Sequence, residues 1–193
     1  MIRILGGTAK GVALKVPDSA RPSPVRLRKA LFDYLRLRYP HKGRFVDLYA
    51  GSGAVGLEAA SEGFQAILVE NDREAVRLLR ENAKYTRLKV QIEGIKVERF
   101  LQIATRKGEQ FQIAFMAPPY PHDLLADFAR LLQANVVEAG GLMILQHPTD
   151  LSLPQGERRS YGFNTFTVIE QRDGEDGRGA QGQQDRGEED LLL

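Results

Sequence analysis

The sequence contains no cysteine, and this absence excludes several kinds of chemistry. Without thiols the chain has no disulfide, no Cys-ligated metal and no thiolate nucleophile. Methylation of a pyrimidine at C5, which needs a cysteine adduct, is therefore not expected. The three histidines, His41, His122 and His147, lack the spacing of metal ligands, so we expect them on the surface or in loops and expect no metal.

The 193 residues also lack any apolar run long enough to span a membrane, and the N-terminus has no signal-peptide pattern. We therefore expect a soluble, cytoplasmic protein without a membrane partner. With 42% hydrophobic residues, the chain is long enough for one domain with a full core.

The formal net charge is only +2, but the charges are unevenly distributed. Residues 1–44 carry eleven Lys and Arg against two acidic residues, whereas residues 171–193 carry seven acidic residues against three Arg. A basic head is typical of a protein that binds a polyanion, although an ordinary solvated surface explains it equally well. The acidic tail has almost no apolar residues before Leu191, so we expect it to be disordered and without chemistry.

The glycine turn Gly51-x-Gly53-x-x-Gly56 is the most informative stretch. A buried strand is predicted before it, at 45–49, and a helix after it, at 54–61. Such a turn lets a ligand approach the backbone, and the helix N-terminus offers unpaired N–H groups. Asp47, four positions before the first glycine, would repel a pyrophosphate but suits a cationic ligand with hydroxyl groups, such as S-adenosylmethionine (AdoMet).

Strands and helices alternate after this turn. Strands are expected at 66–70, 88–92, 111–116 and 142–146, and helices at 73–84, 97–105 and 123–133. This alternation predicts an α/β fold with a mostly parallel sheet and helices on both faces. The last two strands, 158–161 and 165–170, are predicted to form a hairpin that adds an antiparallel edge.

The N-terminal region is expected to form a small extension of this domain. Strands at 2–5 and 12–16 flank a glycine-rich turn and predict a hairpin flap. Ser23 and Pro24 have the pattern of an N-cap and a first helical residue, so a helix is expected at 25–37. Its apolar stripe leaves Arg26, Lys29 and Arg36 facing outward, with Arg28 at the margin. We therefore divide the chain into 1–43, 44–170 and the tail 171–193.

Two further strand ends carry candidate ligand groups. Glu70 lies 19 positions after Gly51, where a carboxylate can accept both ribose hydroxyls of an adenosine. Pro118-Pro119-Tyr120 follows the strand at 111–116; its prolines fix the backbone, and the Tyr ring can stack on a flat base. Such a segment would hold a planar amine-bearing ring against a methyl donor. The simpler interpretations are that Glu70 is a solvated acid at the end of a strand and that Pro118-Pro119-Tyr120 is a plain turn.

With these motifs the sequence resembles the RsmD family, bacterial methyltransferases that modify the N2 amine of a guanine in 16S ribosomal RNA. The resemblance covers most of residues 1–170. It rests on Arg3 to Gly7, the Arg21-Pro22-Ser23 helix start, Asp47 to Glu58, Glu70 and Pro118-Pro119-Tyr120. It implies a Rossmann-like fold with a seven-stranded sheet, AdoMet as cofactor and S-adenosylhomocysteine as product. The implied partner is 16S rRNA in the small subunit or an assembly intermediate, and we expect a monomer.

The resemblance also assigns roles to residues of this chain. The implied cofactor-binding residues are Pro22, Ser23, Asp47, Tyr49, Gly51, Gly53, Glu70, Asn71 and Val97. Val97 would contribute its backbone, because Lys96 stands where the family has an Asp that reaches the adenine. The implied catalytic segment is Ala117, Pro118, Pro119 and Tyr120. RNA phosphates are expected to contact Lys10, Arg21, Arg26, Arg28 and Lys29.

Ala117 departs from the family pattern, in which an Asp or Asn accepts a hydrogen bond from the target amine. Loss of one such bond costs roughly 1–3 kcal/mol, or about one to two decades in rate. The favoured mechanism is direct in-line attack of the amine on the sulfonium methyl, driven by proximity and orientation. Three alternatives stay open: a nicotinamide oxidoreductase, a DNA or RNA adenine-N6 methyltransferase, and a non-catalytic RNA-binding or ribosome assembly protein.

Overall fold

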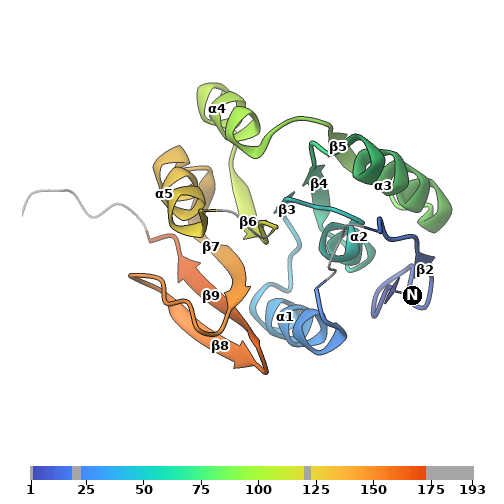
Figure 1. Cartoon of the computed structure of the whole chain (residues 1–193), viewed down its shortest axis with the longest axis horizontal. Helices are drawn as coiled ribbons and strands as arrows, with labels where there is room; N and C mark the ends of the chain where they lie inside the picture. Colours follow the sequence, from blue (N-terminus) through green and yellow to red (C-terminus); the bar gives the residue numbers. More distant parts are fainter. Residues whose placement is uncertain (1, 19–22, 120–122, 173–193) are drawn as a thin grey trace, which may run out of the picture.

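Seven strands form one mixed sheet in the order β5-β4-β3-β6-β7-β9-β8 (Figure 1). The computed structural model describes residues 2–18, 23–119 and 123–172. The strands are β3 (Arg44–Leu48), β4 (Gln65–Val69), β5 (Gln91–Glu93), β6 (Phe111–Met116), β7 (Val137–Pro148), β8 (Glu157–Tyr161) and β9 (Asn164–Glu170). Strands β3 to β7 are parallel, whereas β9 pairs antiparallel with β7 and with β8. The predicted α/β fold with an antiparallel C-terminal hairpin is confirmed.

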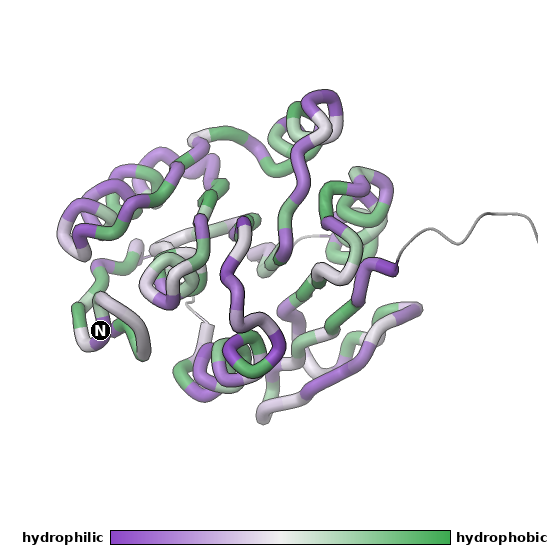
Figure 2. The backbone as a smooth tube through the Cα atoms, turned by 180° about the vertical axis from the view of Figure 1, so that it is seen from behind, coloured by the Kyte–Doolittle hydropathy of each residue, from purple (hydrophilic) through white to green (hydrophobic). Residues whose placement is uncertain are grey.

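Five helices in the described part of the chain cover the two faces of this sheet. The helices α1 (Val25–Arg38), α2 (Ala54–Ser61) and α3 (Arg73–Thr86) lie on one face, and α4 (Val97–Lys107) and α5 (Leu124–Ala134) lie on the other. Neighbouring strand residues point to opposite faces, so Phe45 packs with α1 while Val46 packs with α4 and α5. Figure 2 shows hydrophilic and hydrophobic residues alternating around the helices, as amphipathic helices require.

The N-terminal residues form the expected hairpin, from β1 (Ile2–Arg3) and β2 (Ala13–Leu14). Ile2, Ile4 and Leu14 are buried against α2 and α3. The Asn82 side chain of α3 pairs with both the N–H and the C=O of Lys15, at 2.9 and 2.8 Å. The hairpin therefore packs directly on the helices that flank the glycine turn.

Several local predictions are corrected by tertiary contacts. The strand expected at 88–92 is Gln91–Glu93: Leu88 and Val90 pack against the cluster that contains Leu79 of α3, and the pairing with β4 begins only at Gln91. The strand expected at 142–146 begins already at Val137. Ser23 does not cap α1: the cap residue is Pro24, without a side-chain bond, and the Ser23 hydroxyl donates to Gln146 Oε1 at 2.6 Å.

His147 was expected in a loop or on the surface and is instead buried in β7. Its Nε2 lies 2.7 Å from Thr167 Oγ1 of β9, and its Nδ1 lies 2.7 Å from the Pro148 carbonyl. Burial lowers the pKa of His147. The described helices include none that is long and apolar enough to cross a membrane. The acidic tail from 173 onward lies outside the described residues.

Candidate functional site

The predicted ligand residues gather at one edge of the sheet, beyond the carboxyl ends of the parallel strands. Asp47 lies near the end of β3, and the glycine turn with Gly51 and Gly53 follows that strand. Glu70 follows β4, and Pro118-Pro119 follow β6. The chain leaves β3 toward β4 on one side and leaves β6 toward β7 on the other, so the edge between β3 and β6 is a topological switch point (Figure 1). Ligands of open α/β sheets bind at such points.

The glycine turn after β3 needs its glycines for two different reasons. Gly51 and Gly53 have φ values of 55° and 83°, in the left-handed region that favours glycine. A Cβ on Gly53 would lie 2.4 Å from Leu79, and one on Gly56 would lie 2.5 Å from Leu68, so these two allow close packing of α2. A Cβ on Gly51 would meet nothing within 4 Å. The space over Gly51 therefore admits a ligand to the backbone.

Asp47 is almost fully buried beneath α2, with only 1% of its surface exposed. Its Oδ2 accepts the Gly56 N–H at 2.8 Å, whereas its Oδ1 has no hydrogen-bond partner among the described residues. Burial raises the pKa of Asp47 to about 7, against the opposing effect of the Gly56 bond. A cationic ligand group would offset this cost, so Asp47 fits the ammonium of AdoMet.

Glu70 joins the ends of β3 and β4. Its Oε2 accepts the Gly51 N–H at 2.9 Å, and its Oε1 accepts the N–H groups of Asn71 and Asp72 at 2.8 and 2.9 Å. Because each carboxylate oxygen accepts about two bonds, Oε2 retains capacity for a ribose hydroxyl. The carboxylate is thus already oriented by the backbone of its own turn.

Three further predicted ligand residues differ in exposure and backbone conformation: Asn71, Val97 and Tyr49. Asn71 is exposed, whereas the side chain of Val97, the first residue of α4, is buried in the core and leaves only its backbone for a ligand. Tyr49 has a positive φ of 67°, which is unusual outside glycine. Burial, and then the negative charge of Asp127 on α5, raise the pKa of Tyr49. Its hydroxyl therefore faces the α5 side of the sheet, away from the buried Asp47.

A cavity of about 300 Å³ lies beside Pro118 and Pro119. It is bounded by the start of α5 and the end of β7, and its lining comprises Pro118, Pro119, Asp123, Leu124, Leu125, Gln146, His147, Pro148 and Leu151. Ala117 does not line it, because its side chain packs with the cluster beneath α1. Sequence reasoning missed Gln146; the available signal was a polar residue at the end of an otherwise apolar strand.

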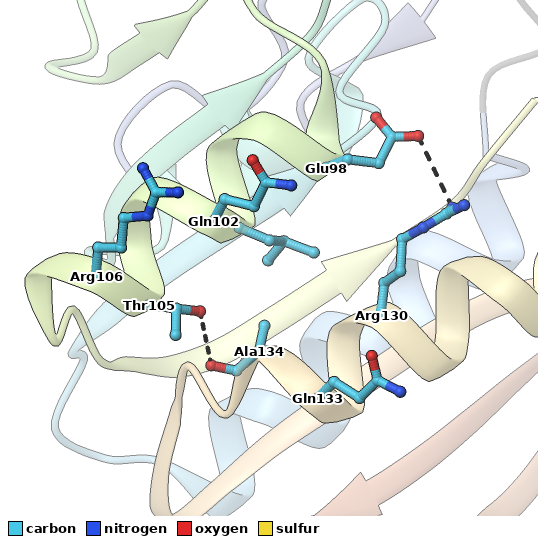
Figure 3. A pocket seen from close by; sticks show the side chains of 8 residues that line it. Glu98, Gln102, Thr105, Arg106, Arg130, Gln133 and Ala134 are labelled. Atoms are coloured by element: carbon cyan, nitrogen blue, oxygen red, sulfur yellow. Dashed lines mark hydrogen bonds and ion pairs between the residues drawn. The ribbon is translucent and has the colours of Figure 1, made fainter.

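A larger cavity, of about 400 Å³, lies between α4 and α5 (Figure 3). Glu98 and Arg130 approach each other across it at 3.8 Å, and the Thr105 hydroxyl donates to the Ala134 carbonyl at 2.9 Å. No residue predicted for the ligand site lines it. We therefore place the candidate site at the strand ends.

Of the described residues that were expected to contact RNA, three are exposed and one is buried. Lys10, Arg26 and Lys29 are exposed. Arg28 has no exposed surface, so it does not lie at the margin of the outward face, and its predicted contact with RNA phosphates is wrong. The reason is α2, which presents Glu58 to the guanidinium at 3.2 Å. Arg21, Pro22 and Tyr120 lie outside the described residues.

The same architecture occurs in solved structures. A hypothetical protein of Thermus thermophilus shares 66% identity and a TM-score of 0.87, over 88% of this chain and 99% of that one. The Thermus thermophilus 16S rRNA N2 G1207 methyltransferase, solved with AdoMet and guanosine, has the same fold with a TM-score of 0.65 at 22% identity, over 80% of this chain and 45% of that one. The chain therefore has the fold of AdoMet-dependent methyltransferases.

The family follows from the sequence comparisons. The family model described as conserved hypothetical protein 95 matches residues 2–169. Ribosomal RNA small subunit methyltransferase D of Escherichia coli K12 is 36% identical over 137 residues, which cover 69% of this chain and 68% of that protein. The chain belongs to the RsmD family.

Proposed function

We propose that the chain transfers a methyl group from AdoMet to the exocyclic N2 amine of a guanine in small-subunit (16S) rRNA. The observation that carries this proposal is the placement of two sites at one sheet edge. The carboxylates of Asp47 and Glu70 flank the glycine turn after β3, and the cavity beside Pro118-Pro119 follows the adjacent strand β6. The name of the Escherichia coli relative supports rRNA as the substrate.

The donor side would hold AdoMet through groups of opposite charge and complementary hydrogen bonding. Asp47 would receive the ammonium, the open backbone at Gly51 would receive the methionine end, and Glu70 would accept the ribose hydroxyls. When bound, AdoMet supplies a methyl group activated by the sulfonium. Asn71 and the Val97 backbone would line the adenine.

The acceptor side has hydrogen-bonding groups that favour guanine. The Ser23 hydroxyl occupies Gln146 Oε1, which leaves the Gln146 N–H donors for an acceptor such as guanine O6. Asp123 Oδ1 accepts the Ala126 N–H at 3.1 Å, and its carboxylate retains capacity for the guanine N1–H. Adenine would present an acceptor at N1, which the Asp123 carboxylate would repel.

The segment 117–120 would orient the amine without a side-chain bond. Pro118 and Pro119 have no N–H, so at these two positions the backbone offers only carbonyl acceptors to the target amine. Tyr120 would stack on the guanine once the base has left its strand. Water would take the departing proton, so this chain would contribute mainly proximity and orientation.

Methyl transfer from radiolabelled AdoMet tests the proposal. The acceptors are small subunits that lack the modification, naked 16S rRNA and DNA. Label at one guanine N2 is the expected result, and label at adenine N6 would establish the adenine-specific alternative. A thermal shift with AdoMet but not with NAD would exclude the oxidoreductase.

A non-catalytic RNA-binding or assembly protein is the second candidate, and Ala117 favours it. The methyl group of Ala117 packs inward and offers no acceptor to an amine. AdoMet binding without methyl transfer to any of the three acceptors would establish this candidate.

A further inference from the structure

The turn between β8 and β9 lies at the same sheet edge as the acceptor cavity. Asn164 opens β9 opposite Pro148, which lines that cavity. Thr149 holds the turn, because its N–H donates to the Phe163 carbonyl and its hydroxyl to the Gly162 carbonyl, both at 3.1 Å. The tip of the hairpin is therefore attached one residue away from the cavity lining.

The tip carries an aromatic ring that contributes nothing to the core. Phe163 is 93% exposed, and Tyr161 beside it is 37% exposed while packing edge-on against Phe166. One exposed apolar residue needs no explanation by itself. The position of Phe163 at the catalytic edge, together with the charges described next, points to a ligand.

Two arginines lie on β8, the strand that leads into the tip. Arg158 donates to Ser152 Oγ at 2.6 Å and to the Thr149 carbonyl at 2.7 Å, and it has no acidic partner among the described residues. Its charge is close enough to the cavity to contribute to the lowered pKa of His147. Arg159 forms an ion pair with Glu157 at 2.9 Å and stacks over the Tyr34 ring of α1 at 4.2 Å, so β8 lies beside α1 (Figure 1). Arg26, at the start of α1, is also exposed and has no ion pair to any described residue.

We propose that the β8–β9 tip binds the nucleotide adjacent to the target guanine, with Phe163 stacked on its base and Arg158 at its phosphate. This inference rests on the proposed function. When the target base leaves its stack, the neighbouring base exposes one face to water. An aromatic ring beside the cavity covers that face, and a cation held by neutral groups keeps its full charge for a phosphate.

Phe163→Ala tests the stacking contact, and Tyr85→Ala is the matched control. Tyr85 is also an exposed aromatic, but it lies in the last turn of α3, at the opposite edge of the sheet. We expect Phe163→Ala to raise the KM for RNA roughly 5- to 100-fold, with kcat and AdoMet affinity unchanged. Phe163→Trp should retain the wild-type KM. A KM within twofold of wild type for Phe163→Ala would overturn the proposal.

A binding measurement separates this inference from the proposed function. Fluorescence anisotropy with an unstructured RNA oligonucleotide and with a duplex of the same sequence needs no methyl transfer. Weaker binding of Phe163→Ala to the single strand alone supports stacking, even where no acceptor is methylated. If Phe163→Ala weakened binding of the single strand and of the duplex equally, the stacking contact would be contradicted. A defect confined to the assembled subunit would show that the tip contacts a protein.

Arg158→Gln tests the phosphate contact, with Arg106→Gln on α4 as its control. Loss of one phosphate contact should lower the slope of log affinity against log salt concentration by about one. We expect this decrease for Arg158→Gln and an unchanged slope for Arg106→Gln. An unchanged slope for Arg158→Gln would exclude the phosphate contact.

Discussion

Asp47 and Glu58, at the two ends of the segment that contains the glycine turn, are both buried carboxylates. They differ in how many partners their oxygens have. Glu58 is fully satisfied: it accepts the N–H groups of Leu5 and Gly6 at 2.7–2.9 Å and pairs with Arg28. Asp47 accepts one bond and keeps an oxygen without a partner among the described residues. Burial raises the pKa of both carboxyl groups. The comparison indicates that Glu58 serves the fold, whereas Asp47 is suited to a ligand.

Glu58→Ala should give the largest effect on stability. The substitution leaves the Arg28 guanidinium buried without its counterion. Two nitrogens of that guanidinium, Nε and Nη2, already lack partners among the described residues. We expect the free energy of unfolding to fall by about 3–5 kcal/mol. Urea denaturation measures this. The double variant Glu58→Ala/Arg28→Met should lose less than Glu58→Ala alone; equal losses would show that the pair is not the cause.

Asp47→Asn should weaken AdoMet binding and leave the free energy of unfolding unchanged, the reverse of what we expect for Glu58→Ala. The amide removes the negative charge that would face the AdoMet ammonium, so we expect about 100-fold weaker AdoMet binding, or roughly 2–3 kcal/mol. Titration calorimetry measures the affinity, and thermal denaturation measures the stability at pH 8. A variant that unfolds as readily as Glu58→Ala would show that Asp47 is structural.

Ala117→Asp extends the comparison to the acceptor side, where the chain has no carboxylate on β6. Because Ala117 packs against the hydrophobic cluster beneath α1, the longer Asp side chain must turn from that cluster toward the cavity to accept one bond from the target amine. We expect kcat to rise by about one to two decades, or roughly 1–3 kcal/mol in the barrier. Single-turnover methyl transfer measures it. The control is AdoMet affinity, which should stay unchanged, and an unchanged or lower kcat would show that the backbone already orients the amine.

Titration of Asp47 should give the smallest effect. Its pKa of about 7 in the folded state lies above the unfolded value near 3.8, so its contribution to stability without ligand declines as pH rises from about 4 to 7. AdoMet affinity should change in the reverse direction, falling up to tenfold per pH unit below pH 7. Calorimetry between pH 5.5 and 8 measures this. Asp47→Asn should show no such dependence; a parallel dependence in the variant would assign it to another group.

Most of the fold and the arrangement of the groups at the ends of β3 and β4 could be predicted from the sequence because their signals are local. The periods of apolar residues located the helices and the strands of the sheet, with errors mainly at the ends of β5 and β7. The glycine turn requires positive φ at Gly51 and Gly53, which few other residues adopt. Asp47 and Glu70 end neighbouring parallel strands, so their distance along the chain already placed them at one edge.

The acceptor side depended on segments that are distant in the chain. Ser23 looked like a helix cap but is bonded to Gln146, and Arg28 looked nearly exposed until α2 covered it. His147 is buried because β9 packs beside β7. The antiparallel return of β9 also brings Phe163 back to the sheet edge that carries the candidate site.

The sequence by itself determined the element order, the glycine turn and the strand-end acids, because hydrophobic period and backbone conformation depend on near neighbours. Only the tertiary structure decided which charged groups are buried and which polar side chains meet at the cavity. Burial removes water from a group, and that depends on whichever segment folds over it, however far along the chain that segment lies.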